Sequence, residues 1–340
     1  MVTVAPVAVE VWRGGLVESR HRAHVCIADA AGRVVEAIGD VDQPVYPRSA
    51  VKPFQALPLV ESGAADAFGL GDAELALACA SHSGEPMHVG LVERWLARLG
   101  LDESALACGG HPPIHAPTAA AMAARGERPR RVHDNCSGKH CGMLTASLHL
   151  GLPVAHYAHA DGTLQRRIAG IIAELADLSE PPPSGTDGCS LPTWALPLRG
   201  LAIATARLAR PDGLPAPRRA ALERVSRAMR RHPELVAGTG RCCTAVMQAL
   251  PDVTAKTGAE GVYIAALHAP GLGLALKVED GATRASEAAL VACLRALGAV
   301  HGPAEAALAA FGRPVLHSRA GEEVGAVAAL ADWPGRMEVR

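Results

Sequence analysis

The sequence predicts a mixed α/β fold of the α+β type, with one antiparallel sheet built from both ends of the chain. Helices are expected to flank this sheet and to form a helical lobe beside it. Strand-like alternation with glycine-containing turns occurs at about 7–40 and 255–280. Between them, at about 50–235, apolar residues recur mainly at helical spacing. Pairing the terminal strands buries both apolar sets, so we expect a single domain over residues 1–340.

The N-terminal segment predicts three strands, at 7–12, 24–28 and 34–38, separated by glycine-containing turns. A helix is expected to begin near Ser49, because Pro53 is tolerated only in the first turn of a helix. Pro58 then predicts a kink or an early break in that helix.

The middle of the chain predicts mainly helices. Asp72 is a candidate N-cap for the first of them. The expected helices cover 72–80, 88–99, 143–150, 164–178, 192–209 and 216–231, with loops at 109–113 and 179–185. Further on, 261–266 and 272–278 flank the turn 269–271 and predict a hairpin, followed by a helix over 284–297.

Composition excludes several classes of partner. The formal net charge of −1 and a pI of about 6.9 provide no overall attraction for nucleic acid or anionic lipid. No apolar run of about 18 residues predicts a membrane span. Residues 1–6 lack the features of a signal peptide, and the nine cysteines are odd in number and scattered. We therefore expect a cytoplasmic protein, which argues against an exported cell-wall enzyme.

The segment around Ser49 contains a possible nucleophile. Ser49 and Lys52 form an S-x-x-K pair, and three residues on a helix place both side chains on one face. Alone, such a pair is usually a solvated helix face. Far downstream, however, Lys256 begins a K-T-G motif, and these two motifs occur together in serine β-lactamases and penicillin-binding proteins. The S-D-N motif of those enzymes is absent. The pairing predicts serine–lysine acyl-transfer chemistry, in which an uncharged lysine accepts the serine proton.

Two further clusters are candidates for a site. Ser81 follows an apolar helix and is a second possible reactive serine, although polar capping of a helix end explains it equally well. Residues 133–142 contain two cysteines, two histidines, an aspartate and a lysine, which suits a soft metal or a polar pocket. Cys136 and Cys141 cannot close a tetrahedral site alone, and Cys189 is a candidate third ligand. The alternative is a buried cysteine pair at a capped helix start.

The vicinal cysteines Cys242 and Cys243 are expected to be small buried hydrophobes.

Five segments together resemble the Rhizobium etli-type L-asparaginase family, often called asparaginase II. They are 46–53, 80–85, 135–140, 187–189 and 256–261, and the likeness runs in order from about residue 7 to 330. The resemblance implies a fold akin to penicillin-binding proteins, serine β-lactamases and glutaminases, assembled as a homodimer. It also implies two serine–lysine tandems and a zinc ion held by two cysteines and a lysine. The tandems correspond to Ser49 with Lys52 and Ser81 with Lys256, and the zinc ligands to Cys136, Lys139 and Cys189.

The substrate implied by the resemblance is L-asparagine, with Ser49 as the nucleophile. We expect the zinc to help bind this substrate rather than to perform the chemistry. Its affinity should fall as the pH drops, because Lys139 must be neutral to bind it. Asp187 and His140 are expected beside the metal and the substrate. Arg48 is a candidate for gripping the substrate α-carboxylate, with a surface or capping role as the alternative.

Two other functions are compatible with parts of the sequence. The S-x-x-K and K-T-G motifs also suit a β-lactamase or a peptidoglycan peptidase, which hydrolysis of a chromogenic cephalosporin would reveal. A non-catalytic zinc-binding protein would instead use Cys136, Cys141, Cys189 and nearby histidines. It would bind about one metal ion per chain and release no ammonia from amides.

Overall fold

The computed structural model of the chain describes residues 4–335 and 337. The chain divides into two compact units. The sheet unit contains the described residues up to Ala50, together with Leu196–Arg210 and those from Ala245 onward. The helical unit contains Val51–Ala195 and Pro211–Thr244. That the whole chain works as one domain stays a prediction.

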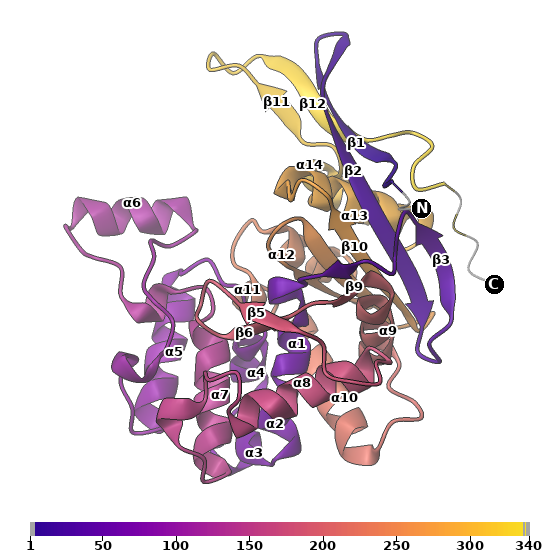
Figure 1. Ribbon diagram of the computed structural model, residues 1–340. Coiled ribbons are helices and arrows are strands. Elements are labelled where there is room, and N and C mark those ends of the chain that lie inside the picture. The colour runs from indigo at the N-terminus through magenta and orange to yellow at the C-terminus, as the bar shows by residue number, and fades with distance from the viewer. Residues whose placement is uncertain (1–3, 336, 338–340) are drawn as a thin grey trace. The chain divides into compact units, whose positions relative to one another are not determined.

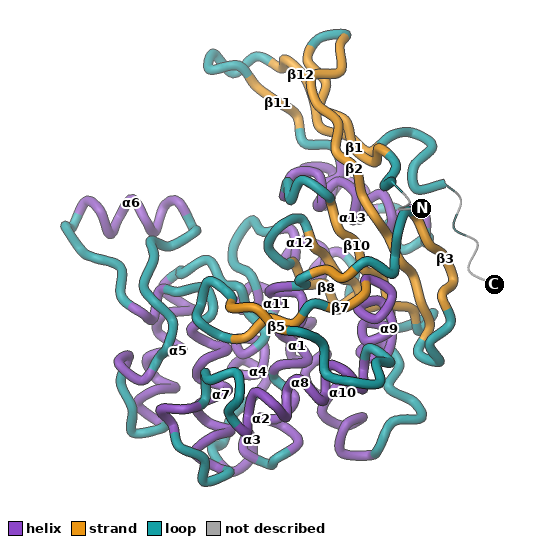
Figure 2. The backbone as a smooth tube through the Cα atoms, viewed as in Figure 1, coloured by secondary structure: helices purple, strands orange, loops and turns teal. Residues whose placement is uncertain are grey.

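The sheet unit is built on one antiparallel sheet with the strand order β11-β12-β1-β2-β10-β9-β8, and β3 pairs with β2 (Figure 2). Its strands are β1 (Val7–Arg13), β2 (Leu16–Asp29), β3 (Val34–Ile38), β8 (Val253–Thr257), β9 (Val262–Leu267), β10 (Leu272–Val278), β11 (Val315–His317) and β12 (Glu323–Ala329). Near the start of the chain, β4 (Pro44–Val45) pairs separately with β7 (Leu196–Pro197). The predicted hairpin of β9 and β10 is confirmed.

Both ends of the chain enter this sheet. Strand β1 pairs with β12 in antiparallel register, with Val9 opposite Ala329, and the two strands lie side by side in Figure 1. On its other edge β1 pairs with β2, whose second half pairs with β10. The prediction of an antiparallel sheet formed by both chain ends is therefore confirmed.

Helices pack on the sheet because its inner strands contain buried runs made up mostly of apolar residues, as in β9, β10 and the second half of β2. Every residue of β9 is buried, and since neighbouring residues of a strand face opposite sides, both faces of this strand are covered. The helices of this unit are α9 (Leu198–Ala209), α13 (Thr283–Ala296) and α14 (Pro303–Gly312). Helix α9 lies so close to β10 that a Cβ atom at Gly273 would come within 2.1 Å of the Ala206 nitrogen.

The helical unit is organised around α7 (Ser137–His149), whose first eleven residues are all buried. The other helices of this unit are α1 (Lys52–Gln55), α2 (Leu57–Glu61), α3 (Ala64–Ala67), α4 (Asp72–Ala78), α5 (Pro86–Arg98), α6 (Ala116–Ala124), α8 (Thr163–Leu175), α10 (Ala216–Arg231) and α11 (Pro233–Val236). A short hairpin joins β5 (Ser184–Thr186) to β6 (Pro192–Trp194). Helix α12 (Cys242–Ala249) crosses the boundary between the units.

Several predicted elements differ from the structure. The expected helix over 192–209 is wrong in its first third, where the chain forms β6 and β7 before α9 begins at Leu198. Asp72 does not cap α4: Gly71 is the N-cap, and its amide donates to the Glu74 carboxylate at 3.0 Å. The break expected at Pro58 is confirmed, because α1 ends at Gln55 and Pro58 lies in the first turn of α2.

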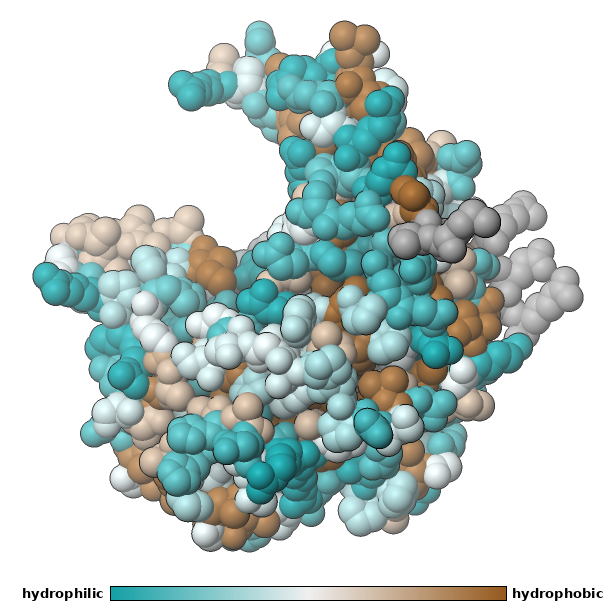
Figure 3. Space-filling model, viewed as in Figure 1, coloured by the Kyte–Doolittle hydropathy of each residue, from teal (hydrophilic) through white to brown (hydrophobic). Residues whose placement is uncertain are grey.

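The surface of the helical unit includes α6, whose alanine-rich residues are mostly exposed and form a pale-brown stretch in Figure 3. Within residues 4–335 and 337, no helix has both the length and the apolar character needed to cross a membrane.

Candidate active site

Ser49 lies on a tight turn in the sheet unit. The turn is the 3-10 helix η1 (Arg48–Val51), which runs directly into α1. Arg48, just before the serine, has a φ of 52°, a left-handed conformation that non-glycine residues seldom adopt. The Ala50 amide closes the turn by donating to the Pro47 carbonyl at 3.0 Å. The expected helix start near Ser49 is thus a 3-10 turn, and the α-helix begins three residues later.

The K-T-G motif ends against this turn. Lys256 and Thr257 are on β8, and Gly258 follows it. A Cβ atom at Gly258 would come within 2.3 Å of the Pro47 carbonyl oxygen, so only glycine allows this approach. The Lys256 Nζ donates to the Thr257 carbonyl at 2.8 Å. The structure therefore brings the Ser49 turn and the end of the K-T-G strand together, as the sequence motifs suggest.

Lys52 is fully buried within the helical unit and has three hydrogen-bond acceptors. Its Nζ donates to the Ala80 carbonyl, to the Ser81 Oγ at 3.0 Å and to the Cys136 Sγ at 3.1 Å. Lys52 therefore joins the second predicted serine to the cysteine cluster, a connection that sequence spacing did not show.

The loop that carries Ser81 is held by contacts that the sequence did not predict. His82 is fully buried, and its Nε2 lies 2.9 Å from the Ser137 Oγ at the start of α7. Its Nδ1 accepts from the Gly84 amide at 3.2 Å, so the ring proton is on Nε2. Burial lowers the pKa of His82 well below its usual value, which keeps the ring neutral.

The other side of this loop is tied to residues 236–239. The Ser81 amide donates to the Val236 carbonyl at 2.9 Å. The Glu85 carboxylate accepts from the Thr239 amide and hydroxyl at 2.8 and 2.7 Å. Ser81 is thus fixed from two directions. The sequence pointed to Ser81 through the polar run after an apolar helix and through the resemblance of segment 80–85, but not to these contacts.

The three predicted metal ligands lie together. Cys136 and Lys139 are at the start of α7, and Cys189 is on the turn between β5 and β6. The Lys139 Nζ donates to the Cys189 Sγ at 3.1 Å, and Cys136 and Cys189 are hydrogen-bonded to each other. All three side chains are at least 96% buried. The segments 135–140 and 187–189 therefore form one polar cluster in the helical unit.

The ionisable groups in this cluster shift one another's pKa values. The hydrogen bond between Cys136 and Cys189, together with the positive charge of Lys139, lowers the pKa of Cys189 to about 5. The same hydrogen bond and burial raise the pKa of Cys136 to about 12. Burial opposes the charge of Lys139, but the two sulfurs outweigh it and raise the pKa of the lysine. The metal-free cluster therefore favours an ammonium–thiolate pair between Lys139 and Cys189.

These donors suit a zinc ion. Zinc is bound by thiolates and by neutral nitrogen, and the two sulfurs and one nitrogen converge here within hydrogen-bond distance. In the described residues, no group of three histidine, cysteine or acidic side chains is arranged to hold a metal ion. A site at this position therefore depends on Lys139 as its third donor, rather than on the histidines of the segment.

His140 lies beside the cluster with one unused donor. The ring is fully buried, and its Nδ1 lies 2.7 Å from the Tyr157 hydroxyl, whose oxygen accepts from the Ala107 amide. We assign the hydroxyl proton to this contact, so that Nδ1 accepts it. Its Nε2 has no hydrogen-bond partner among the residues that the structure describes. Burial, and next the charge of Lys139, lower the pKa of His140 to about 3. The neutral ring therefore keeps an N–H available for a bound group.

Asp187 and a second acid are also close to the cluster. The Asp187 carboxylate accepts from the Gly188 amide at 2.7 Å, and its charge contributes to the raised pKa of Lys139. Asp134, which the sequence suggested only as part of the 133–142 segment, accepts from the Cys136 amide at 2.7 Å. Each acid lies two positions before a predicted zinc ligand in the chain.

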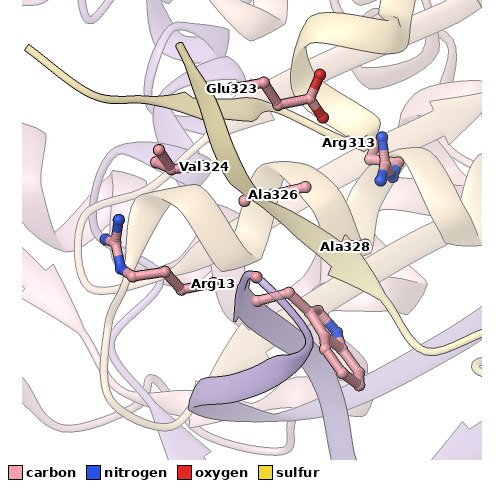
Figure 4. Close-up of a pocket in the computed structure, with 9 residues that line it drawn as sticks. Arg13, Arg313, Glu323, Val324, Ala326 and Ala328 are labelled. Carbon is pink, nitrogen blue, oxygen red and sulfur yellow. The ribbon is translucent and has the colours of Figure 1, made fainter. Parts of the chain in front are cut away.

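A separate cavity in the sheet unit contains none of the predicted site residues. It has a volume of about 970 Å³ and lies along β1 and β12, with Trp12, Arg13, Arg313 and Glu323 in its lining (Figure 4). The predicted chemistry is therefore elsewhere in the chain.

Comparison with known proteins decides the family. The sequence profile described as L-asparaginase II matches residues 9–329. The chain belongs to the L-asparaginase II family. The resemblance predicted from the five segments is thus confirmed, and the family to which the chain belongs is one of amidohydrolases. No curated protein sequence gives a significant match to this member of the family.

Several solved structures resemble this L-asparaginase II family member at low identity. Mglu in its native form is 16% identical, with a TM-score of 0.45, covering 81% of this chain and 63% of that one. Another Mglu structure is 18% identical, with a TM-score of 0.41, covering 81% and 65%. A β-lactamase from Mycobacterium bovis is 15% identical, with a TM-score of 0.44, covering 80% and 94%. The chain therefore spans slightly less than two thirds of the Mglu chains.

Proposed function

We propose that the protein hydrolyses L-asparagine to L-aspartate and ammonia, with Ser49 as the nucleophile. Membership of the L-asparaginase II family supports the substrate. The observation that carries the mechanism is the buried Lys52, which follows the Ser49 turn directly and is hydrogen-bonded to a second serine, Ser81. Ammonia release from asparagine, compared with glutamine, tests the proposal directly.

In the first step, the Ser49 hydroxyl attacks the side-chain amide carbon and an uncharged Lys52 accepts its proton. The lysine becomes an ammonium group, and its three acceptors match that charge state. The amide C–N bond then breaks, and a proton is returned to the departing nitrogen, with Ser81 as the relay. A β-aspartyl ester on Ser49 remains.

In the second step, water hydrolyses the ester, the Ser49 oxygen regains its proton, and aspartate leaves. We assign Lys256 to the second tandem with Ser81, where its positive charge would favour the uncharged form of Lys52. We assign Arg48 to the substrate α-carboxylate, because a guanidinium binds carboxylates through two parallel hydrogen bonds.

Cys136, Lys139 and Cys189 would hold the zinc ion, whose charge would help bind the polar end of asparagine. The unused Nε2–H of His140 and the Asp187 carboxylate support this assignment, since buried polar groups beside a metal orient its ligands or the substrate. We also propose a homodimer in the cytoplasm. The nine cysteines, all buried free thiols, are compatible with a reducing compartment.

Removing the zinc is expected to weaken substrate binding more than it lowers the maximal rate. Protein treated with a chelator should show a KM for asparagine raised by about tenfold, while kcat stays within about threefold of its starting value. Metal analysis before and after treatment establishes the loading. An equal collapse of the rate at saturating asparagine would make the metal part of the chemistry.

The glycine of the K-T-G motif gives a second prediction. In Gly258→Ala the new methyl group must displace the Pro47 carbonyl and shift the Ser49 turn. We expect kcat to fall by at least about tenfold, with a stability loss of about 1–3 kcal/mol. Gly15→Ala is the matched control, because a Cβ atom there has nothing within 4 Å. Equal activity of the two variants would remove this contact from the positioning of Ser49.

A further inference from the structure

A cavity in the helical unit lies between the end of α7 and the start of α8. Its volume is about 380 Å³, and its lining comes from residues between Ser147 and Arg166. Besides Tyr157, whose hydroxyl is hydrogen-bonded to His140, the polar members of the lining are Ser147, His156, His159, Asp161, Thr163 and Arg166. The proposed reaction uses none of the last six residues, so the cavity needs an explanation of its own.

The first residues of α8 line this cavity, and the helix has no side-chain N-cap. Gly162 is the N-cap residue, no side chain accepts from the first-turn amides, and the first turn contains no acidic residue. These amides need acceptors, and the partial positive charge of a 13-residue helix favours a negative group beside them. The uncapped helix start therefore favours an oxyanion.

Ser147 supplies an independent sign of a ligand from the neighbouring helix. The residue is fully buried on α7, lines the cavity, and its Oγ has no hydrogen-bond partner among the described residues. Leaving a buried hydroxyl without a partner is costly, so such groups normally bind water or a ligand. The cavity thus borders both an uncapped helix start on α8 and an unpartnered buried hydroxyl on α7.

The charged groups of the lining carry both signs. Arg166 is held at the helix start by donating to the backbone carbonyl of Asp161, whose side chain is exposed. The rings of His156 and His159 are stacked with their centres 5.0 Å apart. The turn between these histidines and the helix is compact, because a Cβ atom at Gly162 would come within 2.8 Å of the His156 carbonyl oxygen.

We propose that this cavity binds a small zwitterionic α-amino acid. Its carboxylate would accept from the first-turn amides of α8, the Ser147 hydroxyl and Arg166, while its ammonium group would pair with Asp161. This ligand gives partners to both charge types in the lining, whereas a phosphate dianion would be repelled by Asp161. The proposal is independent of the proposed reaction, because it uses other residues.

The test uses the full-length protein with isotope-labelled histidines and follows the ring signals of His156 and His159 by NMR. The signals are assigned from the His156→Gln and His159→Gln variants. L-Alanine is the probe, because it has the α-amino acid group but no side-chain amide that the proposed reaction could cleave. Sodium acetate and inorganic phosphate are the comparison ligands. We expect L-alanine to shift both rings saturably, and more tightly than either anion.

Variants separate the two ends of the ligand. Arg166→Gln should weaken the binding of L-alanine about tenfold, the loss of one charge-assisted hydrogen bond. Asp161→Asn should weaken the binding of L-alanine but not that of acetate. Arg128→Gln, an exposed arginine outside the lining, is the control and should bind normally.

Ser147→Ala distinguishes a ligand contact from a structural role. Because the Oγ has no partner within the described chain, this variant should unfold at the same temperature as the parent or higher, yet bind L-alanine more weakly. The proposal is overturned if L-alanine leaves both rings unshifted at tens of millimolar, if all three ligands bind equally, or if Asp161→Asn and Arg166→Gln bind L-alanine normally.

Discussion

Ser49→Ala is expected to lower the rate of ammonia release from L-asparagine by about a thousandfold or more, while the protein stays folded. The expected size follows from removing the atom that forms the ester, since loss of a nucleophile in serine hydrolases costs about 10³–10⁶ in kcat. The fold should be retained, because alanine keeps the Cβ atom and is tolerated in a turn of this kind. Circular dichroism and the unfolding temperature verify this.

A control serine in the same unit separates this effect from a general one. Ser19 is half-buried on β2 and is not one of the predicted site residues, so Ser19→Ala should leave turnover within about twofold of the parent. Substantial turnover by Ser49→Ala would take Ser49 out of the nucleophile role and direct attention to Ser81.

Lys52→Ala is expected to cause a loss of similar size, about a thousandfold, because it removes the base that accepts the Ser49 proton. It also leaves the Ala80 carbonyl and the Ser81 hydroxyl without their donor in a buried space, at a cost of about 1–3 kcal/mol. Stability should therefore fall slightly, but far less than activity.

A small amine should partly restore the activity of Lys52→Ala. The substitution leaves a buried space beside three acceptors, and methylamine can enter it and take the proton in place of the missing lysine. The measurement is kcat/KM against methylamine concentration at several pH values, where the unprotonated amine should be the active form. Lys277→Ala on β10 is the control and should need no rescue. Full activity of Lys52→Ala without amine would contradict the assignment.

The sequence predicted best those helices and strands that can be recognised from the spacing of their own residues. Helix α10 was predicted with its observed bounds, because apolar residues recur at helical spacing among charged ones over 216–231 and Pro215 precedes it. The strand β12 was missed, because its mixture of glycine, alanine and valine has little strand character and is stabilised by pairing with β1. The error at 192–209 has the same origin, since β6 and β7 are short and exist through their pairing partners.

The sequence predicted which residues belong to the candidate site, but not which of them contact one another. Motifs identified Ser81, Cys136 and Lys52 separately, yet nothing in their spacing showed that the lysine donates to the other two. Likewise, the cluster at 133–142 offered several possible ligands, and only folding brought Cys189 to Lys139. The roles of His82 and Glu85 in fixing the Ser81 loop depend on residues more than 50 positions away, which no local pattern records.

The pairing of β1 with β12 has a consequence for how the protein is made. As the chain leaves the ribosome, β1 (Val7–Arg13) emerges long before its neighbour β12 (Glu323–Ala329), because most of the described chain lies between them. Until then one edge of β1 exposes unpaired backbone groups, which can pair with another nascent chain. Contacts between the ends of a long chain also form slowly. Completion of this sheet is therefore expected to be a late event in folding, and chains that lack residues from 323 onward should aggregate rather than accumulate as native protein.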